Sequence, residues 1–131
     1  MPATGLQPAT SVASTCAVAI GVVPFNSQLR ALLTGSHWSL EWAANADAAI
    51  ERLKSEPVPV LICDAGSWEE VVKASRNVSR PPTVFVFTAA PNDKEWLEAL
   101  AAGACYVDVR RLDARHLFSL LNHAWRVWNK E

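Results

Sequence analysis

An aspartate ends the most apolar stretch of this chain. Val60-Leu61-Ile62-Cys63 is a continuous hydrophobic run that leads directly into Asp64, Ala65 and Gly66. A strand that is buried on both faces of a sheet has such a continuous run rather than an alternating one. The carboxyl ends of parallel strands form the crevice in which open α/β sheets bind ligands. Asp64 is therefore a candidate phosphoacceptor, metal ligand or general base.

No second acidic residue is predicted to lie beside Asp64. The preceding apolar run, Ala17 to Val23, continues into Pro24 and Phe25 and carries no carboxylate at its end. Carboxylates are the side chains that hold Mg²⁺ in proteins, and the sequence has neither a Cys-x-x-Cys motif nor two histidines at i, i+4. We therefore expect no metal and no cofactor, with Mg²⁺ required only if Asp64 is phosphorylated.

Length and composition indicate one globular domain. The chain has 131 residues, of which 50% are hydrophobic, and a net charge of -1. Its basic residues are scattered, so we expect no nucleic-acid partner, and its apolar runs are too short for a membrane helix, so we expect no membrane partner. The N-terminus lacks the charged region of a signal peptide, so we expect a cytoplasmic protein. Residues 1–15 lack periodicity and are predicted to be a disordered tail before a domain at 16–131. The three cysteines are predicted to be reduced and buried.

Apolar runs alternate with segments of helical periodicity. The pattern predicts strands at Cys16–Val23, Ser39–Trp42, Val58–Cys63, Thr83–Phe87 and Cys105–Val109, and helices at Asn26–Leu33, Ala46–Lys54, Trp68–Asn77 and Asp93–Ala102, with a final helix capped by Asp113 and reaching about Trp128. Asn92 and Glu95 form a predicted capping box, and Gly103 closes the helix that follows them. Five βα units of this length predict a parallel, doubly wound sheet with helices on both faces.

From Cys16 to Trp128 the chain resembles the CheY-like receiver domain of two-component response regulators. Val60–Asp64 resembles the third strand and the phosphoacceptor, Thr88 occupies the position of the switch hydroxyl, and Arg110 falls where the family has a lysine. Trp96–Ala104 resembles the fourth helix and the Gly-Ala that follows it. The resemblance implies a flavodoxin-like fold with strand order 2-1-3-4-5.

The chain also departs from the family pattern. The acidic pair that receivers carry after the first strand falls within Val22-Val23-Pro24-Phe25, and the aromatic switch position is Val107, with Tyr106 one residue early and on the other face. Without the acidic pair, we expect Asp64 to pair with Arg110, directly or through Thr88. The alternative for Asp64 is an ordinary strand-end carboxylate that binds the amides of Ser67 or Trp68.

The last two helices carry a surplus of tryptophan. Leu97, Leu100 and Ala101 form the stripe predicted to face the sheet, which leaves Trp96 at its edge, and Trp125 and Trp128 widen the buried stripe of the final helix. In receivers these helices and the strand between them form the usual dimer and output surface. By resemblance, Trp96, Trp125 and Trp128 are candidates for a protein interface, with a homodimer as one form. Alternatively, these rings fill a core otherwise rich in small residues.

The predicted function is a receiver-like signalling domain that binds a protein partner, without enzyme activity and without metal-dependent phosphorylation. One alternative is a phosphorylatable receiver in a two-component phosphorelay, with Asp64 as the acceptor. A second is a small flavodoxin-like binding protein or enzyme. A flavodoxin-like phosphate site would need glycines and hydroxyl side chains directly after the first strand. The sequence has Pro24 and Phe25 there instead, which disfavours this second alternative.

Overall fold

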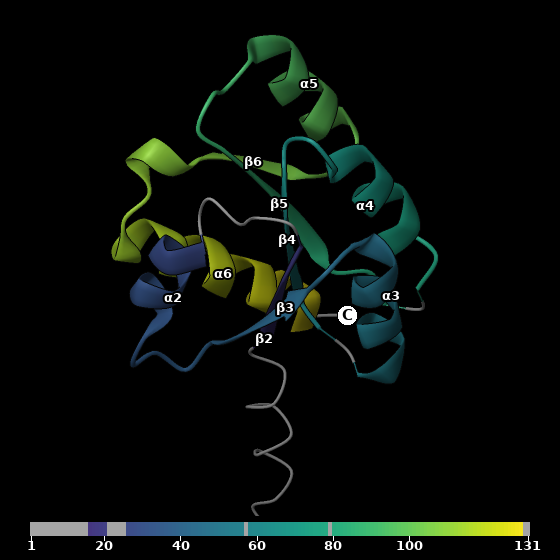
Figure 1. Ribbon diagram of the computed structural model, residues 1–131, viewed down its shortest axis with the longest axis horizontal. Helices are drawn as coiled ribbons and strands as arrows, with labels where there is room; N and C mark the ends of the chain where they lie inside the picture. Colours follow the sequence, from purple (N-terminus) through teal and green to yellow (C-terminus); the bar gives the residue numbers. More distant parts are fainter. Residues whose placement is uncertain (1–15, 21–25, 57, 79, 130–131) are drawn as a thin grey trace, which may run out of the picture.

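Five parallel strands form a single sheet. The computed structural model describes residues 16–20, 26–56, 58–78 and 80–129, so the predicted tail at 1–15 lies outside the described residues. The strands are β2 (Cys16–Ile20), β3 (Ser39–Ala43), β4 (Val60–Asp64), β5 (Thr83–Thr88) and β6 (Cys105–Asp108). Their order is β3-β2-β4-β5-β6, all parallel (Figure 1), which is 2-1-3-4-5 in chain order and confirms the predicted fold class.

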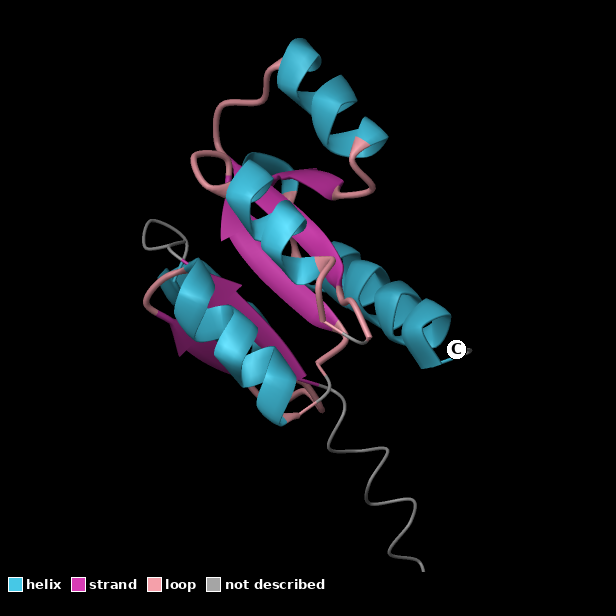
Figure 2. Cartoon of the chain, turned by 90° about the vertical axis from the view of Figure 1, so that its right-hand side faces the viewer, coloured by secondary structure: helices cyan, strands magenta, loops and turns pink. Residues whose placement is uncertain are grey.

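Helices cover both faces of this sheet. They are α2 (Asn26–Leu33), α3 (Ala46–Ser55), α4 (Trp68–Ser75), α5 (Asp93–Ala101) and α6 (Ala114–Asn129), with a 3₁₀ turn, η2, at Val109–Arg111. Helices α2 and α6 lie on one face, and α3 and α4 lie on the other. Helix α5 stands at one end of the molecule, beyond α4 and next to β6 (Figure 2).

Side chains alternate along each strand between two apolar layers. The layer under α2 and α6 contains Ala17, Ala19, Val60, Ile62, Phe85, Phe87 and Val107. The opposite layer, under α3 and α4, contains Val18, Ile20, Leu61, Cys63, Val84, Val86 and Tyr106. Tyr106 and Val107 thus lie on different faces, as predicted from the two-residue repeat of a strand.

The predicted caps at Asp113 and Gly103 are present. Asp113 Oδ1 accepts a hydrogen bond from the His116 amide at 2.7 Å. The structure adds a cap at Asn45, whose Oδ1 accepts the Ala48 amide at 2.9 Å. Gly103 has a φ of 88° and ends α5. The Gly103 amide donates to the carbonyl of Leu100 at 3.0 Å, and the Ala104 amide donates to that of Ala99 at 2.9 Å. Several ends of elements differ by one or two residues, and the predicted end of the first strand at Val23 lies outside the described residues. In particular, β4 begins at Val60, because Pro59 has no amide proton to donate.

The cysteines are free thiols. Cys16 and Cys63 are buried and Cys105 is partly buried, which agrees with the predicted reduced state. Burial raises the pKa of Cys63 to about 12 and also raises that of Cys105. In the described part of the chain, no helix combines the length and the apolar character needed to span a bilayer.

Candidate functional site

Asp64 lies at the carboxyl end of β4, where the sequence predicted it. Its Oδ1 accepts hydrogen bonds from the Gly66 amide at 3.1 Å and from the Ser67 hydroxyl at 2.9 Å. The Asp64 carbonyl also accepts the Ser67 amide at 3.3 Å. Ser67 precedes α4 but does not cap it with its side chain, since its hydroxyl is directed to Asp64. The carboxylate therefore stabilises its own strand-to-helix turn, through the Gly66 amide rather than those of Ser67 or Trp68.

Thr88 ends the neighbouring strand and is nearly buried. It is 5% exposed and pairs in register with Asp108 of β6. Its hydroxyl oxygen accepts a hydrogen bond from the Ala90 amide at 3.0 Å. Like Asp64, Thr88 satisfies a backbone group of the loop that follows its own strand.

Arg110 does not pair with Asp64, so that prediction is wrong. Its guanidinium binds Asp108 in a two-point contact, with Nε 3.0 Å from Oδ1 and Nη2 2.9 Å from Oδ2. Asp108 Oδ1 also accepts the Arg110 amide at 3.0 Å and thereby caps η2. These bonds to Arg110 lower the pKa of Asp108 to about 2. Arg110 binds Asp108 because Asp108 ends β6 only two residues before it.

The sequence reasoning overlooked Asp108, although its spacing was a usable signal. An acidic residue two positions before an arginine, at the predicted end of a strand, can both cap a turn and pair with the side chain. Asp108 is therefore the residue that fixes the position of Arg110.

The three residues at positions that resemble a receiver site, Asp64, Thr88 and Arg110, thus do not bind one another. Within the described residues, no hydrogen bond or ion pair joins any two of Asp64, Thr88 and Arg110. No group of three or more His, Cys, Asp or Glu side chains in that part of the chain could hold a metal ion. The positions of the missing acidic pair, residues 22–25, lie outside the described residues, and their side chains are Val, Val, Pro and Phe. The donor set around Asp64 therefore does not fit Mg²⁺, which requires several oxygen ligands.

A hydrogen-bonded cluster at the start of α5 was not predicted in full. Asn92 Oδ1 accepts the Glu95 amide at 3.0 Å, which confirms half of the capping box. The Tyr106 hydroxyl occupies the other half, because it accepts the Asn92 amide at 3.3 Å and donates to Glu95 Oε1 at 2.5 Å. Burial, followed by the hydrogen bond to Glu95, raises the pKa of Tyr106, so the phenol keeps its proton at neutral pH.

The stripe predicted to face inward on α5 faces solvent instead. Leu97 is 68% exposed and Leu100 is 54% exposed, and Ala101 is also exposed, whereas Ala99 is fully buried. Trp96 is 42% exposed and stacks on Tyr106 with the ring centroids 5.6 Å apart. We call Trp96, Leu97, Leu100 and Ala101 the α5 outer face.

Trp128 of α6 belongs to the core rather than to an exposed surface, and the role of Trp125 stays a prediction. Trp128 is 5% exposed, and the Arg80 guanidinium lies 3.7 Å from the centroid of its ring. Arg80 Nη2 also donates to the Trp128 carbonyl at 2.7 Å. Trp125 is partly buried against the α2/α6 layer. The prediction of an exposed interface residue is therefore wrong for Trp128, because Arg80 covers its ring.

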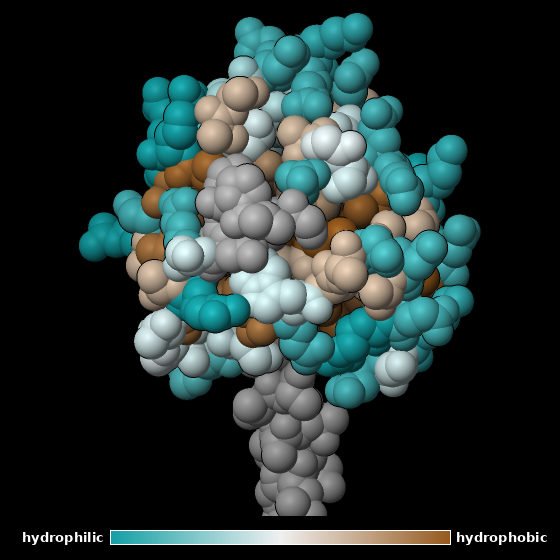
Figure 3. Space-filling model, viewed as in Figure 1, coloured by the Kyte–Doolittle hydropathy of each residue, from teal (hydrophilic) through white to brown (hydrophobic). Residues whose placement is uncertain are grey.

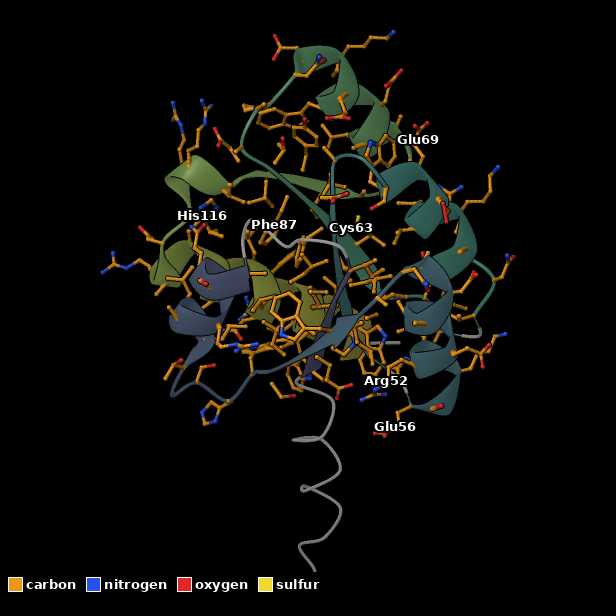
Figure 4. The ribbon with its side chains drawn as sticks, in the orientation of Figure 1. Arg52, Glu56, Cys63, Glu69, Phe87 and His116 are labelled. Atoms are coloured by element: carbon orange, nitrogen blue, oxygen red, sulfur yellow. The ribbon has the colours of Figure 1, made fainter. Side chains whose placement is uncertain are left out.

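A shallow groove adjoins the α5 outer face. It lies between α4 and α5 and has a volume of about 700 Å³. Its lining residues are Trp68, Glu69, Glu70, Val72, Lys73, Arg76, Glu98, Ala101 and Ala102. Glu69, on the α4 wall of the groove, is directed toward the end of the molecule at which α5 stands (Figure 4). In the space-filling view, hydrophilic side chains form most of the rim of the molecule, and hydrophobic ones are visible between them (Figure 3).

No protein-family model matches the chain, and a comparison with curated proteins finds no significant sequence match. Solved structures match its fold. A response regulator receiver domain from Bermanella marisrubri has a TM-score of 0.71 and 18% identity, covering 85% of this chain and 98% of that one. A two-component response regulator from Clostridium difficile has a TM-score of 0.69 and 21% identity, covering 85% of this chain and 95% of that one.

A third match is the beryllofluoride-activated receiver domain dimer of NtrC4. It has a TM-score of 0.72 and 16% identity and covers 87% of this chain and 98% of the NtrC4 domain. Together with the strand order and the helices on both faces, these matches show that the chain has the fold of a CheY-like response regulator receiver domain.

Proposed function

We propose that this chain is a receiver-like signalling domain that binds a protein partner and has neither enzyme activity nor metal-dependent phosphorylation. The receiver fold supports the signalling role. The observation that carries the rest is that, among the described residues, no hydrogen bond or ion pair joins any two of Asp64, Thr88 and Arg110. Phosphoryl transfer to a carboxylate needs a cation to neutralise the transferring oxygens, and this edge of the sheet has a poor donor set for one.

The α5 outer face is the proposed docking surface. Trp96, Leu97 and Leu100 are large apolar side chains that remain exposed on one helix, whereas most side chains of this type are buried in the domain. Contiguous exposed apolar surface is typical of protein interaction sites, and tryptophan is enriched among the residues that dominate binding energy. A partner that covers this face would remove from water the stripe that the sequence pattern places inside.

The partner we propose is a second copy of the chain. Lys94 and Glu98 are exposed and lie one helical turn apart beside Leu97, and Glu98 also lines the groove between α4 and α5. A two-fold axis makes an interface self-complementary. If two α5 helices pack antiparallel across such an axis, Lys94 of each copy lies opposite Glu98 of the other. The same pairing joins the apolar outer faces. The NtrC4 receiver, which shares this fold, was solved as a dimer.

Sedimentation velocity on charge-reversal variants tests this proposal. We expect the wild type to self-associate in the micromolar range, and Lys94→Glu and Glu98→Lys each to weaken association. The double variant Lys94→Glu/Glu98→Lys restores the opposite charges and should recover most of it. Val127→Ser is the matched control, because Val127 is 42% exposed but lies on α6. A wild type that stays monomeric throughout this range, or a double variant that is weaker than both single variants, would contradict the proposed homodimer.

A further inference from the structure

The first turn of α5 depends on a side chain from another element. In a capping box, the carboxylate at the third helical position accepts the backbone amide of the N-cap residue directly. Here the Tyr106 hydroxyl from β6 lies between these two groups. It accepts from the Asn92 amide at 3.3 Å and donates to Glu95 Oε1 at 2.5 Å. The cap is therefore completed only when α5 lies against β6.

The remaining attachments of α5 are few. Ala99 is the only residue of α5 that is buried, and an alanine methyl group removes little apolar surface from water. At the other end of the helix, Arg76 Nη2 donates to the Ala102 carbonyl at 2.6 Å. Trp96 stacks on the Tyr106 ring with an interplanar angle of 31°. By contrast, α6 contributes fully buried Leu117 and Leu121 to the core.

We propose that Tyr106 is a latch that fixes α5, so that breaking its hydroxyl contacts releases the helix while the sheet and the other helices stay folded. This extends the proposed function, because the latch sets the position in which the α5 outer face is presented to a partner. Elements with few buried apolar contacts open locally at a lower free energy than the global core. The raised pKa of Tyr106 supports the arrangement, since the phenol must keep its proton to donate to Glu95.

Hydrogen exchange on Tyr106→Phe tests the latch, because this variant keeps the ring and the stack with Trp96 but loses the hydroxyl. The measurement is made at a concentration at which the protein is monomeric, so its result does not depend on the proposed dimer. A hydrogen bond to a charged group contributes about 1.5–3 kcal/mol. We therefore expect the α5 amides to exchange about tenfold faster or more, with amides of β4, β5 and α6 unchanged.

Variants of Glu95 provide the matched control. Glu95→Gln keeps a side-chain oxygen that can accept from Tyr106 but loses the charge, so its α5 amides should exchange at a rate between those of the wild type and Tyr106→Phe. Glu95→Ala should reproduce the acceleration seen in Tyr106→Phe. Unchanged α5 exchange in Tyr106→Phe would overturn the latch. So would an equal acceleration in every element, which would make Tyr106 an ordinary core residue, or an acceleration in Tyr106→Phe that Glu95→Ala does not share.

Discussion

Truncating a leucine of α5 should cost far less stability than truncating one of α6. Complete burial of a leucine side chain contributes about 1.5–3 kcal/mol. Leu97 is 68% exposed, so only about a third of that contribution is present, and Leu97→Ala should cost at most about 1 kcal/mol. Leu117 is fully buried, and removing a fully buried leucine side chain costs about 2–5 kcal/mol because a cavity adds to the lost burial.

Urea unfolding at a low protein concentration measures both variants in the monomer. We expect the midpoint of Leu97→Ala to lie close to that of the wild type, and the midpoint of Leu117→Ala to fall several times further. The slope of the transition should be the same in all three proteins, so that the midpoints report the free energy of unfolding. If Leu97→Ala is destabilised as much as Leu117→Ala, α5 packs its leucines inward and the docking surface proposed here does not exist.

Three further substitutions or modifications have expected outcomes. Asp64→Asn should change the free energy of unfolding by less than about 1 kcal/mol, because the amide oxygen can still accept from Gly66 and Ser67. Asp64→Ala removes this acceptor and should cost more, so equal unfolding midpoints for the two variants would contradict this prediction. Because burial raises the pKa of Cys63 to about 12, iodoacetamide at pH about 8 should modify the partly exposed Cys105 well before Cys63. Peptide mass mapping measures both rates, and equal rates would contradict the burial of Cys63. The pKa of Asp108 is lowered to about 2, so the stability that its charge contributes is present above the unfolded pKa of about 3.9 and is lost as the pH falls toward 2. Asp108→Asn should therefore flatten the pH dependence of the free energy of unfolding between these values, and an unchanged profile would contradict the pairing with Arg110.

The fold was predictable because each element carries its own local signal. Val60–Cys63 and Val84–Phe87 are continuous apolar runs, as strands covered on both faces require. Asn92 and Gly103 mark the two ends of α5 through chemistry that depends only on neighbouring residues. The short spacing between strands and helices then leaves few ways to connect them.

The site was less predictable because its contacts depend on which of several partners lies nearest. Asp64 was placed correctly at a strand end, but the pattern could not show that Arg110 binds Asp108 instead. The orientation of α5 was assigned wrongly because an apolar stripe is assumed to face the core, and Leu97 and Leu100 do not. The role of Tyr106 required the sheet, since residues 92, 95 and 106 meet only when β6 lies beside α5.

The most direct test of the central claim is the intact mass of the protein after incubation with a small phosphodonor, such as acetyl phosphate, and Mg²⁺. Asp64 lacks the acidic pair that would help to hold the cation, and Asp108, which also ends a strand at this edge of the sheet, is bound to Arg110. We therefore predict an unchanged mass. A stoichiometric, base-labile phosphoryl adduct that is lost in Asp64→Asn would contradict the account and make this chain a working phosphoacceptor.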